Sequence, residues 1–166
     1  MPRMITRKIG GEIITMSSLV GVISDTHGLI RSEAFRLFEG VDVIFHGGDI
    51  GSVEVIKALE QIAPVVAVRG NCDRGEWSED LPVSRSFEIN GQRFLIIHKL
   101  QDLKTLSQPF DAIIFGHSHQ SRVSVNNGIL YLNPGSAGPK RFWLPVSVAR
   151  IRIENGKLLP EIIELV

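Results

Sequence analysis

Seven side chains of metal-ligand type stand in this chain where short apolar runs end. They are Asp25, His27, Asp49, Asn71, His98, His117 and His119. In layered α/β folds, residues at the carboxyl ends of strands converge on one crevice. Nitrogen and oxygen donors without a thiolate favour manganese, iron, cobalt, nickel or zinc over calcium or magnesium. The spacing therefore predicts one site for divalent metal ions.

Glycines accompany these residues in each of four loops. The loops are Asp25-Thr26-His27-Gly28, Gly47-Gly48-Asp49, Gly70-Asn71-Cys72-Asp73 and Gly116-His117-Ser118-His119. Glycine lets a backbone bend sharply beside a ligand. A single histidine at a strand end is more often a structural residue than a ligand. The complete set reverses that preference, because turn formation alone does not require the imidazoles.

The elements that must position these residues alternate between strands and helices in the first half of the chain. Residues 19–24, 42–46 and 65–69 are predicted as buried strands, and apolar spacing predicts helices at 34–38 and 53–62. In the second half, three Asn-Gly pairs at 90–91, 127–128 and 155–156 predict hairpins, so that half should be mostly antiparallel. The expected fold class is α/β, a two-sheet β-sandwich flanked by helices.

We expect an N-terminal extension, residues 1–18, and a single domain, residues 19–166. The first segment carries Arg3, Arg7 and Lys8 but has no apolar run of signal-peptide length. The alternative is an edge strand at residues 12–15, which have the β-propensity for it.

The composition of the chain argues against nucleic-acid binding and against membrane association. Lysine plus arginine and aspartate plus glutamate balance at 18 each, so no basic field supports stable nucleic-acid binding. Apolar runs are shorter than the roughly 20 residues that span a bilayer, so no membrane association is expected. The single cysteine, Cys72, excludes an internal disulfide framework and fits a cytoplasmic location.

In order, the loop blocks resemble the D-x-H, G-D, G-N, H and G-H-x-H motifs of calcineurin-like metallophosphoesterases. The match spans residues 19 to about 140, and five ordered blocks make it specific. Chain length and the Gly-Asn-Cys-Asp block resemble the small single-domain bacterial and archaeal branch, several of whose members are phosphodiesterases. The resemblance implies a phosphate-ester small molecule as the substrate.

The resemblance also implies a role for each ligand. Asp25, His27 and His119 would hold one metal, Asn71, His98 and His117 a second, and Asp49 would bridge both. A shared carboxylate lessens the repulsion between dications about 3.5–4 Å apart. Manganese is the first choice for the metal. Asp49, Asn71 and His98 would act in catalysis through the metals, with a bridging hydroxide attacking phosphorus.

Two positions depart from the wider family. Cys72 stands where larger members carry a histidine often assigned as general acid, and a thiol is a poor donor to a leaving oxygen. We expect Cys72 to be a small buried packing residue. Lys99 follows His98 where many relatives have His-Gly-His, so the second histidine is missing or Lys99 supplies its role.

Three further polar features lie among or after the predicted ligands in the sequence. Asp73 is either an acceptor that orients neighbouring ligands or a turn residue. His46 is expected to be structural, and the segment from Asn133 to Ser136 either presents backbone N–H groups to a phosphate or forms a plain turn.

Two other function classes stay open. One is a noncatalytic scaffold, like the retromer subunit that keeps this fold for protein binding. The second is a nuclease, like larger members that carry added capping domains. The full ligand set argues against the first, and the lack of a basic stripe argues against the second. A homo-oligomer is possible.

Overall fold

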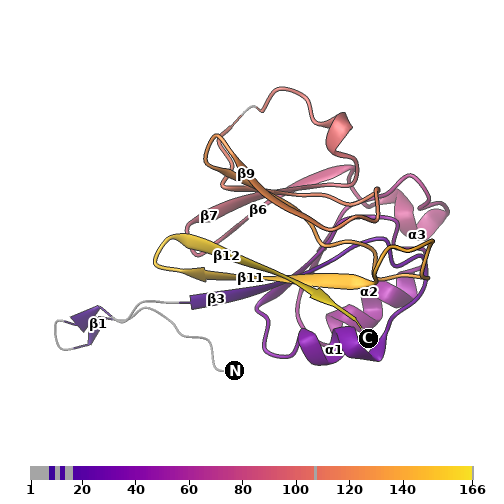
Figure 1. Ribbon diagram of the computed structural model, residues 1–166, viewed down its shortest axis with the longest axis horizontal. Coiled ribbons are helices and arrows are strands. Elements are labelled where there is room, and N and C mark those ends of the chain that lie inside the picture. Colours follow the sequence, from indigo (N-terminus) through magenta and orange to yellow (C-terminus); the bar gives the residue numbers. More distant parts are fainter. Residues whose placement is uncertain (1–7, 10–11, 14–16, 107, 166) are drawn as a thin grey trace.

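The computed structural model describes residues 8–9, 12–13, 17–106 and 108–165. Two five-stranded sheets form its main body (Figure 1). The β3 sheet has the order β12 (Lys157–Glu164), β11 (Ser147–Glu154), β3 (Ser17–Ile23), β4 (Val43–His46) and β5 (Val65–Ala67). The β8 sheet has the order β6 (Ser84–Ile89), β7 (Gln92–Ile97), β8 (Ala112–Ile114), β10 (Ile129–Asn133) and β9 (Arg122–Asn126).

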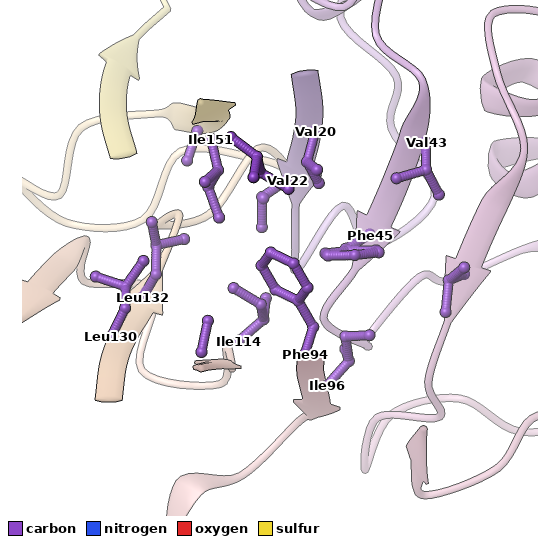
Figure 2. Close-up of a cluster of buried hydrophobic side chains, with 14 of the residues drawn as sticks. Val20, Val22, Val43, Phe45, Phe94, Ile96, Ile114, Leu130, Leu132 and Ile151 are labelled. Atoms are coloured by element: carbon purple, nitrogen blue, oxygen red, sulfur yellow. The ribbon is translucent and has the colours of Figure 1, made fainter. Parts of the chain in front are cut away.

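The main hydrophobic core lies between the facing sides of the two sheets (Figure 2). Val20, Val22 and Phe45 come from the β3 sheet, while Phe94 and Leu132 come from the β8 sheet. The rings of Phe45 and Phe94 meet edge to face, with centroids 5.0 Å apart, which is a favourable aromatic geometry. Alternate strand residues point to opposite faces, so strands covered on both sides read as continuous apolar runs.

The helices pack on the outer face of the β3 sheet. Helix α1 (Ser32–Leu37) and helix α2 (Val53–Glu60) are the crossovers that connect the parallel strands β3, β4 and β5. Their buried side chains pack against Ile23, Ile44 and Ala67. A shorter helix, α3 (Glu76–Glu79), and a 3₁₀ turn, η1 (Leu100–Asp102), lie in later loops. This arrangement places the carboxyl ends of β3, β4 and β5 along one edge.

The predicted sandwich is confirmed, with one refinement of the strand pairing. All three Asn-Gly pairs join antiparallel strands, as expected, at β6–β7, β9–β10 and β11–β12. Strand β8, however, pairs parallel with both β7 and β10. The predicted helix 53–62 ends at Glu60, and the predicted strand 42–46 begins at Val43.

The N-terminal residues contain a separate hairpin. β1 (Lys8–Ile9) pairs with β2 (Glu12–Ile13) as a two-stranded sheet of its own (Figure 1). Of the edge strand considered for residues 12–15, the first two residues form a strand, in this separate hairpin. Residues 14–16 lie outside the described part. β3 already includes Ser17 and Ser18. The division into an extension and a domain stays a prediction.

Within the described residues, no helix has the length and apolar character that crossing a membrane requires.

Candidate metal centre

All seven predicted ligands come together at the carboxyl ends of the strands. Two groups of ligand atoms, each lying within 4.8 Å of one another, contain Asp25, His27 and His119 in one case and Asp49, His98 and His117 in the other. The seventh residue, Asn71, places its Oδ1 3.0 Å from His98 Nε2. Each of the seven residues lies one to five positions after the end of a strand, so the loops that follow these strands build the centre.

Asp25 presents one free carboxylate oxygen to the first group. Its Oδ2 accepts hydrogen bonds from the Ser24 hydroxyl at 2.6 Å and from the His117 N–H at 3.1 Å. Its Oδ1 is buried and has no hydrogen-bond partner, although His119 Nε2 lies 3.3 Å away. His27 Nε2 is also buried without a partner, 3.9 Å from the same oxygen. Unpartnered buried atoms of this kind fit the ligands of a cation.

Asp49 faces both groups. Its Oδ1 accepts a hydrogen bond of 2.8 Å from the backbone N–H of Cys72. Its Oδ2 lies 3.3 Å from His98 Nε2 and 3.8 Å from His27 Nε2. His27 belongs to the first ligand group and His98 to the second. This oxygen therefore stands where a carboxylate shared by two ions would have to be.

His98 is held with its Nε2 toward the centre. Its Nδ1 donates to the carbonyl oxygen of Gly47 over 2.7 Å, which fixes the ring orientation. Burial lowers the pKa of His98, but the hydrogen bond and charge of Asp49 and the charge of Asp25 outweigh burial and raise it. A bound cation would compete with that proton for Nε2, because a ligand histidine must be neutral.

The pKa shifts of four further candidate ligands favour the forms that a metal needs. Burial raises the pKa of Asp49, but hydrogen bonds from His98 and from the Cys72 N–H outweigh it and lower the pKa well below the usual range. Burial also works against ionisation of Asp25, whose pKa is nevertheless lowered by His119 and Ser24. Burial lowers the pKa of His27 and of His117, which favours the neutral imidazoles. The donor set therefore fits divalent metal ions.

The backbone at the centre is locally strained. Five of the seven ligands have a positive φ, namely Asp25 (55°), His27 (46°), Asp49 (53°), His117 (73°) and His119 (61°). A non-glycine residue in the left-handed region costs roughly 1–2 kcal/mol. Such strain concentrates at functional sites, where the surrounding structure enforces it.

Glycines of the same loops permit close contacts with the ligands. A Cβ at Gly70 would lie 2.1 Å from both the backbone nitrogen and Oδ1 of Asp49. A Cβ at Gly116 would lie 2.1 Å from Ser24 Oγ and 2.6 Å from Asp25 Oδ2. No side chain fits at either position, so these glycines are required by the proximity of the loops to one another.

Several supporting residues hold the loops in place. Asp73 is buried and accepts hydrogen bonds from the N–H groups of Gly51 and Gly70, so it joins two loops instead of orienting a ligand side chain. His46 is also structural, as predicted: its Nδ1 accepts from the Gly48 N–H, and its Nε2 contacts Thr26 Oγ1.

Three further supports were missed by the sequence analysis or left open. Asn133 donates to the carbonyl oxygen of Gly116 and to Ser118 Oγ. Ser136 Oγ donates to the carbonyl oxygen of Asp25, while Ser24 donates to its carboxylate. In the sequence, these supports could have been recognised as short polar residues that either adjoin a candidate ligand or lie in a loop that contains glycine.

The prediction that Cys72 is a buried packing residue is wrong. The side chain is exposed, and its Sγ forms a group with ligand atoms of His27 and Asp49. Its backbone N–H donates to Asp49 Oδ1, so the loop is held beside the centre, not packed into the core. Partial burial and the charge of Asp49 raise the pKa of the thiol. Cys72 is thus placed beside the centre as a neutral thiol.

Comparison with known protein families and curated proteins identifies the family. Residues 19–156 match the family model of the calcineurin-like phosphoesterase superfamily domain. A probable metallophosphoesterase of Methanothermobacter thermautotrophicus is 38% identical over 159 residues, covering 87% of this chain and 91% of the relative. A phosphodiesterase of Methanocaldococcus jannaschii is 30% identical over 136 residues, covering 70% of this chain and 82% of that protein.

Solved structures have the same fold. An archaeal phosphodiesterase superposes with a TM-score of 0.72 at 26% identity, covering 89% of this chain and 99% of its own. Vacuolar protein sorting 29 from Cryptosporidium parvum reaches the same TM-score of 0.72 at 22% identity, covering 90% of this chain and 98% of its own, which shows the fold alone. With the ligand groups at its strand ends, this chain belongs to the calcineurin-like phosphoesterase superfamily.

Proposed function

We propose that the chain is a phosphodiesterase that uses two divalent metal ions. Asp25, His27 and His119 would hold one ion, and Asn71, His98 and His117 the other. Asp49 would bind both. The observation that carries the proposal is Asp49 Oδ2, which faces His27 at 3.8 Å and His98 at 3.3 Å. The named phosphodiesterase among the relatives supports a diester substrate.

The positive charge of the centre with its metal ions bound would favour an anionic substrate. Divalent ions held by the seven candidate ligands would supply Lewis-acid chemistry to a phosphoryl oxygen and to water. Among the seven ligands only Asp25 and Asp49 are acidic, so two dications leave a formal charge of about +2. His98 keeps its orientation through the bond from Nδ1 to Gly47. Asp49 is held in place through Cys72 N–H.

The test is metal dependence with a chromogenic diester. Protein stripped with a chelator should not hydrolyse bis-p-nitrophenyl phosphate, and manganese should restore the activity, with iron, cobalt, nickel and zinc as comparisons. A noncatalytic scaffold would bind metal without turnover. Activity that persists in the stripped protein would contradict the proposal.

The neutral thiol of Cys72 leads to a prediction on leaving groups. General acid help contributes about 10²–10⁴ in rate, and a thiol with a raised pKa supplies little of it. Aryl diesters should therefore be cleaved well, whereas alkyl diesters should be cleaved much more slowly. Monoesters should also be slower, as the phosphodiesterase among the relatives suggests.

The measurement is the slope of log kcat/KM against leaving-group pKa, at saturating manganese, for the wild type and for Cys72→His. We expect a steep negative slope that becomes flatter in the variant. A wild-type slope that is already flat while chemistry limits the rate would mean that another group donates the proton, with Lys99 as the first residue to test.

A further inference from the structure

A pocket of about 420 Å³ opens beside the second ligand group. Asn71 and His98 belong to its lining, so it is continuous with the centre, and three basic residues, Arg69, Arg74 and Lys99, line it as well. A volume of this size lies within the range of small-molecule sites, about 300–1,000 Å³. The pocket can hold the part of a substrate that extends away from the reacting phosphate.

The three cations reach the pocket from separate segments. Arg69 follows β5, Arg74 precedes α3, and Lys99 follows β7. Within the described part of the chain, none of the three side chains makes an ion pair or a hydrogen bond with another residue. Their binding capacity is therefore available to a ligand. Arginine offers a planar fork that matches phosphate, and lysine supplies a compact charge.

The lining holds three basic residues against two acids, Asp73 and Asp102, so its formal charge stays positive. Asp73 is buried, and its two oxygens accept the N–H groups of Gly51 and Gly70. Asp102, in η1, is exposed. Val83, whose side chain is 60% exposed, also lines the pocket and offers an apolar contact to a carbon skeleton. Basic groups and an apolar surface in one pocket suit an organic phosphate.

We propose that the pocket binds a second phosphate group carried by the same substrate, whose phosphodiester lies at the metal centre. The inference rests on the proposed function for the reaction, and it adds the substrate class: phosphodiesters that bear a further phosphate on one of their alcohols. Arg69, Arg74 and Lys99 bind that phosphate and set specificity.

The test compares two chromogenic substrates that differ by one phosphate. They are the p-nitrophenyl esters of thymidine 5′-phosphate and of thymidine 3′,5′-bisphosphate, esterified at the 5′-phosphate in both cases. For the manganese-loaded protein we expect kcat/KM to be about tenfold higher for the bisphosphate ester, since a hydrogen bond to a charged group contributes about that factor or more. Arg69→Gln and Arg74→Gln should each bring the ratio of the two values toward one.

Lys57→Gln is the matched control, because it removes an exposed positive charge from α2, outside the pocket lining. It should keep the wild-type ratio. A second readout does not need turnover: calorimetric titration should show about tenfold tighter binding of thymidine 3′,5′-bisphosphate than of thymidine 5′-phosphate, and Arg74→Gln should abolish the difference.

The outcomes separate the two proposals. Equal kcat/KM for the two esters together with equal binding of the two nucleotides overturns the pocket assignment and leaves the phosphodiesterase proposal standing. A preference that Lys57→Gln reduces as much as Arg74→Gln also overturns it, because the effect then reflects net charge. If neither ester is hydrolysed, the proposed reaction fails, and calorimetry alone decides on the pocket.

Discussion

The hairpin turns and the loops of the metal centre both contain residues with a positive φ, yet the residue types differ. Asn90, Asn127 and Asn155 adopt φ values of 51°, 51° and 52° in the turns. Asparagine tolerates this conformation, and each of the three precedes a glycine. At the centre, aspartate and histidine adopt it instead. Strand β7 shows how the two regions are separated: the Asn90-Gly91 turn precedes it, and His98 of the metal centre follows it. The turn and the metal centre therefore lie at opposite ends of this strand.

The glycines of the two regions differ in the same way. A Cβ at Gly91, Gly128 or Gly156 would meet nothing within 4 Å, so these positions need glycine only for their backbone angles. A Cβ at Gly70 or Gly116 would collide with atoms that hold or form the ligands. The turns thus follow from local preference, whereas contacts between distant loops impose the geometry of the centre. Four predictions test this difference.

The largest effect is expected from the shared carboxylate. Asp49→Ala should lose both metal ions and reduce activity by about 10³-fold or more, since bound metals supply several kcal/mol of transition-state stabilisation. His119→Ala should chiefly weaken one ion, because it belongs to one ligand group. Metal analysis of the purified variants gives the counts. Two ions retained in Asp49→Ala would rule out the bridging role.

The next effect concerns Gly70→Ala. The added methyl group would meet Asp49 N and Oδ1 at 2.1 Å, so the carboxylate must move. We expect metal affinity to fall by about 10–100-fold, as for other changes to the support of a metal ligand. Gly128→Ala is the control and should leave metal affinity unchanged. Equal metal affinity in the two variants would show that contact with Asp49 is not the reason for this glycine.

A third prediction concerns the free energy of unfolding at acidic pH, which the buried His46 should lower. Burial lowers the pKa of His46 from 6.5 to about 3, and both ring nitrogens already have partners. Below pH 6.5 the unfolded chain therefore binds a proton that the folded chain refuses, so stability falls as the pH falls. Between pH 7 and pH 5 this histidine alone should cost about 2 kcal/mol of unfolding free energy.

Urea denaturation of the metal-free protein at the two pH values measures this loss, with His46→Asn as the comparison. The variant should be less stable at pH 7 but should lose about 2 kcal/mol less than the wild type on going to pH 5. An equal loss in both proteins would mean that the folded state accepts the proton.

The smallest effect is expected at the turns. Asn127→Ala should lower stability by about 1 kcal/mol, because alanine is disfavoured at a φ of 51°. Asn127→Gly should be close to neutral. Thermal denaturation gives the stability, and diesterase activity should match the wild type in both variants. A loss of activity would mean that the two ends of the strands are coupled.

The sequence was sufficient for features that depend on order and local preference. The seven candidate ligands could be named because each follows a predicted strand, and the structure brings their side chains together. The Asn-Gly pairs located the hairpins. The parallel pairing of β8 was not predicted, because a three-residue strand does not show which neighbours it will have. The four-residue helix α3 is too short for a periodic pattern.

Contacts between distant segments explain the remaining differences. A hydrogen bond joins the exposed Cys72 to Asp49, 23 positions earlier in the chain, and so places it beside the centre. The basic pocket combines Arg69, Arg74 and Lys99 from three loops. No local pattern marks those residues, so their convergence could be recognised only in the folded chain.

The bond between Asp49 and Cys72 has an evolutionary consequence. The carboxylate is held by the backbone N–H of residue 72, not by its side chain. Every residue except proline offers that N–H. The side chain at position 72 can therefore change over generations without dismantling the metal centre. If the residue at position 72 can donate a proton to a leaving group, that ability could be gained or lost by a single substitution while the metal-binding framework is inherited intact.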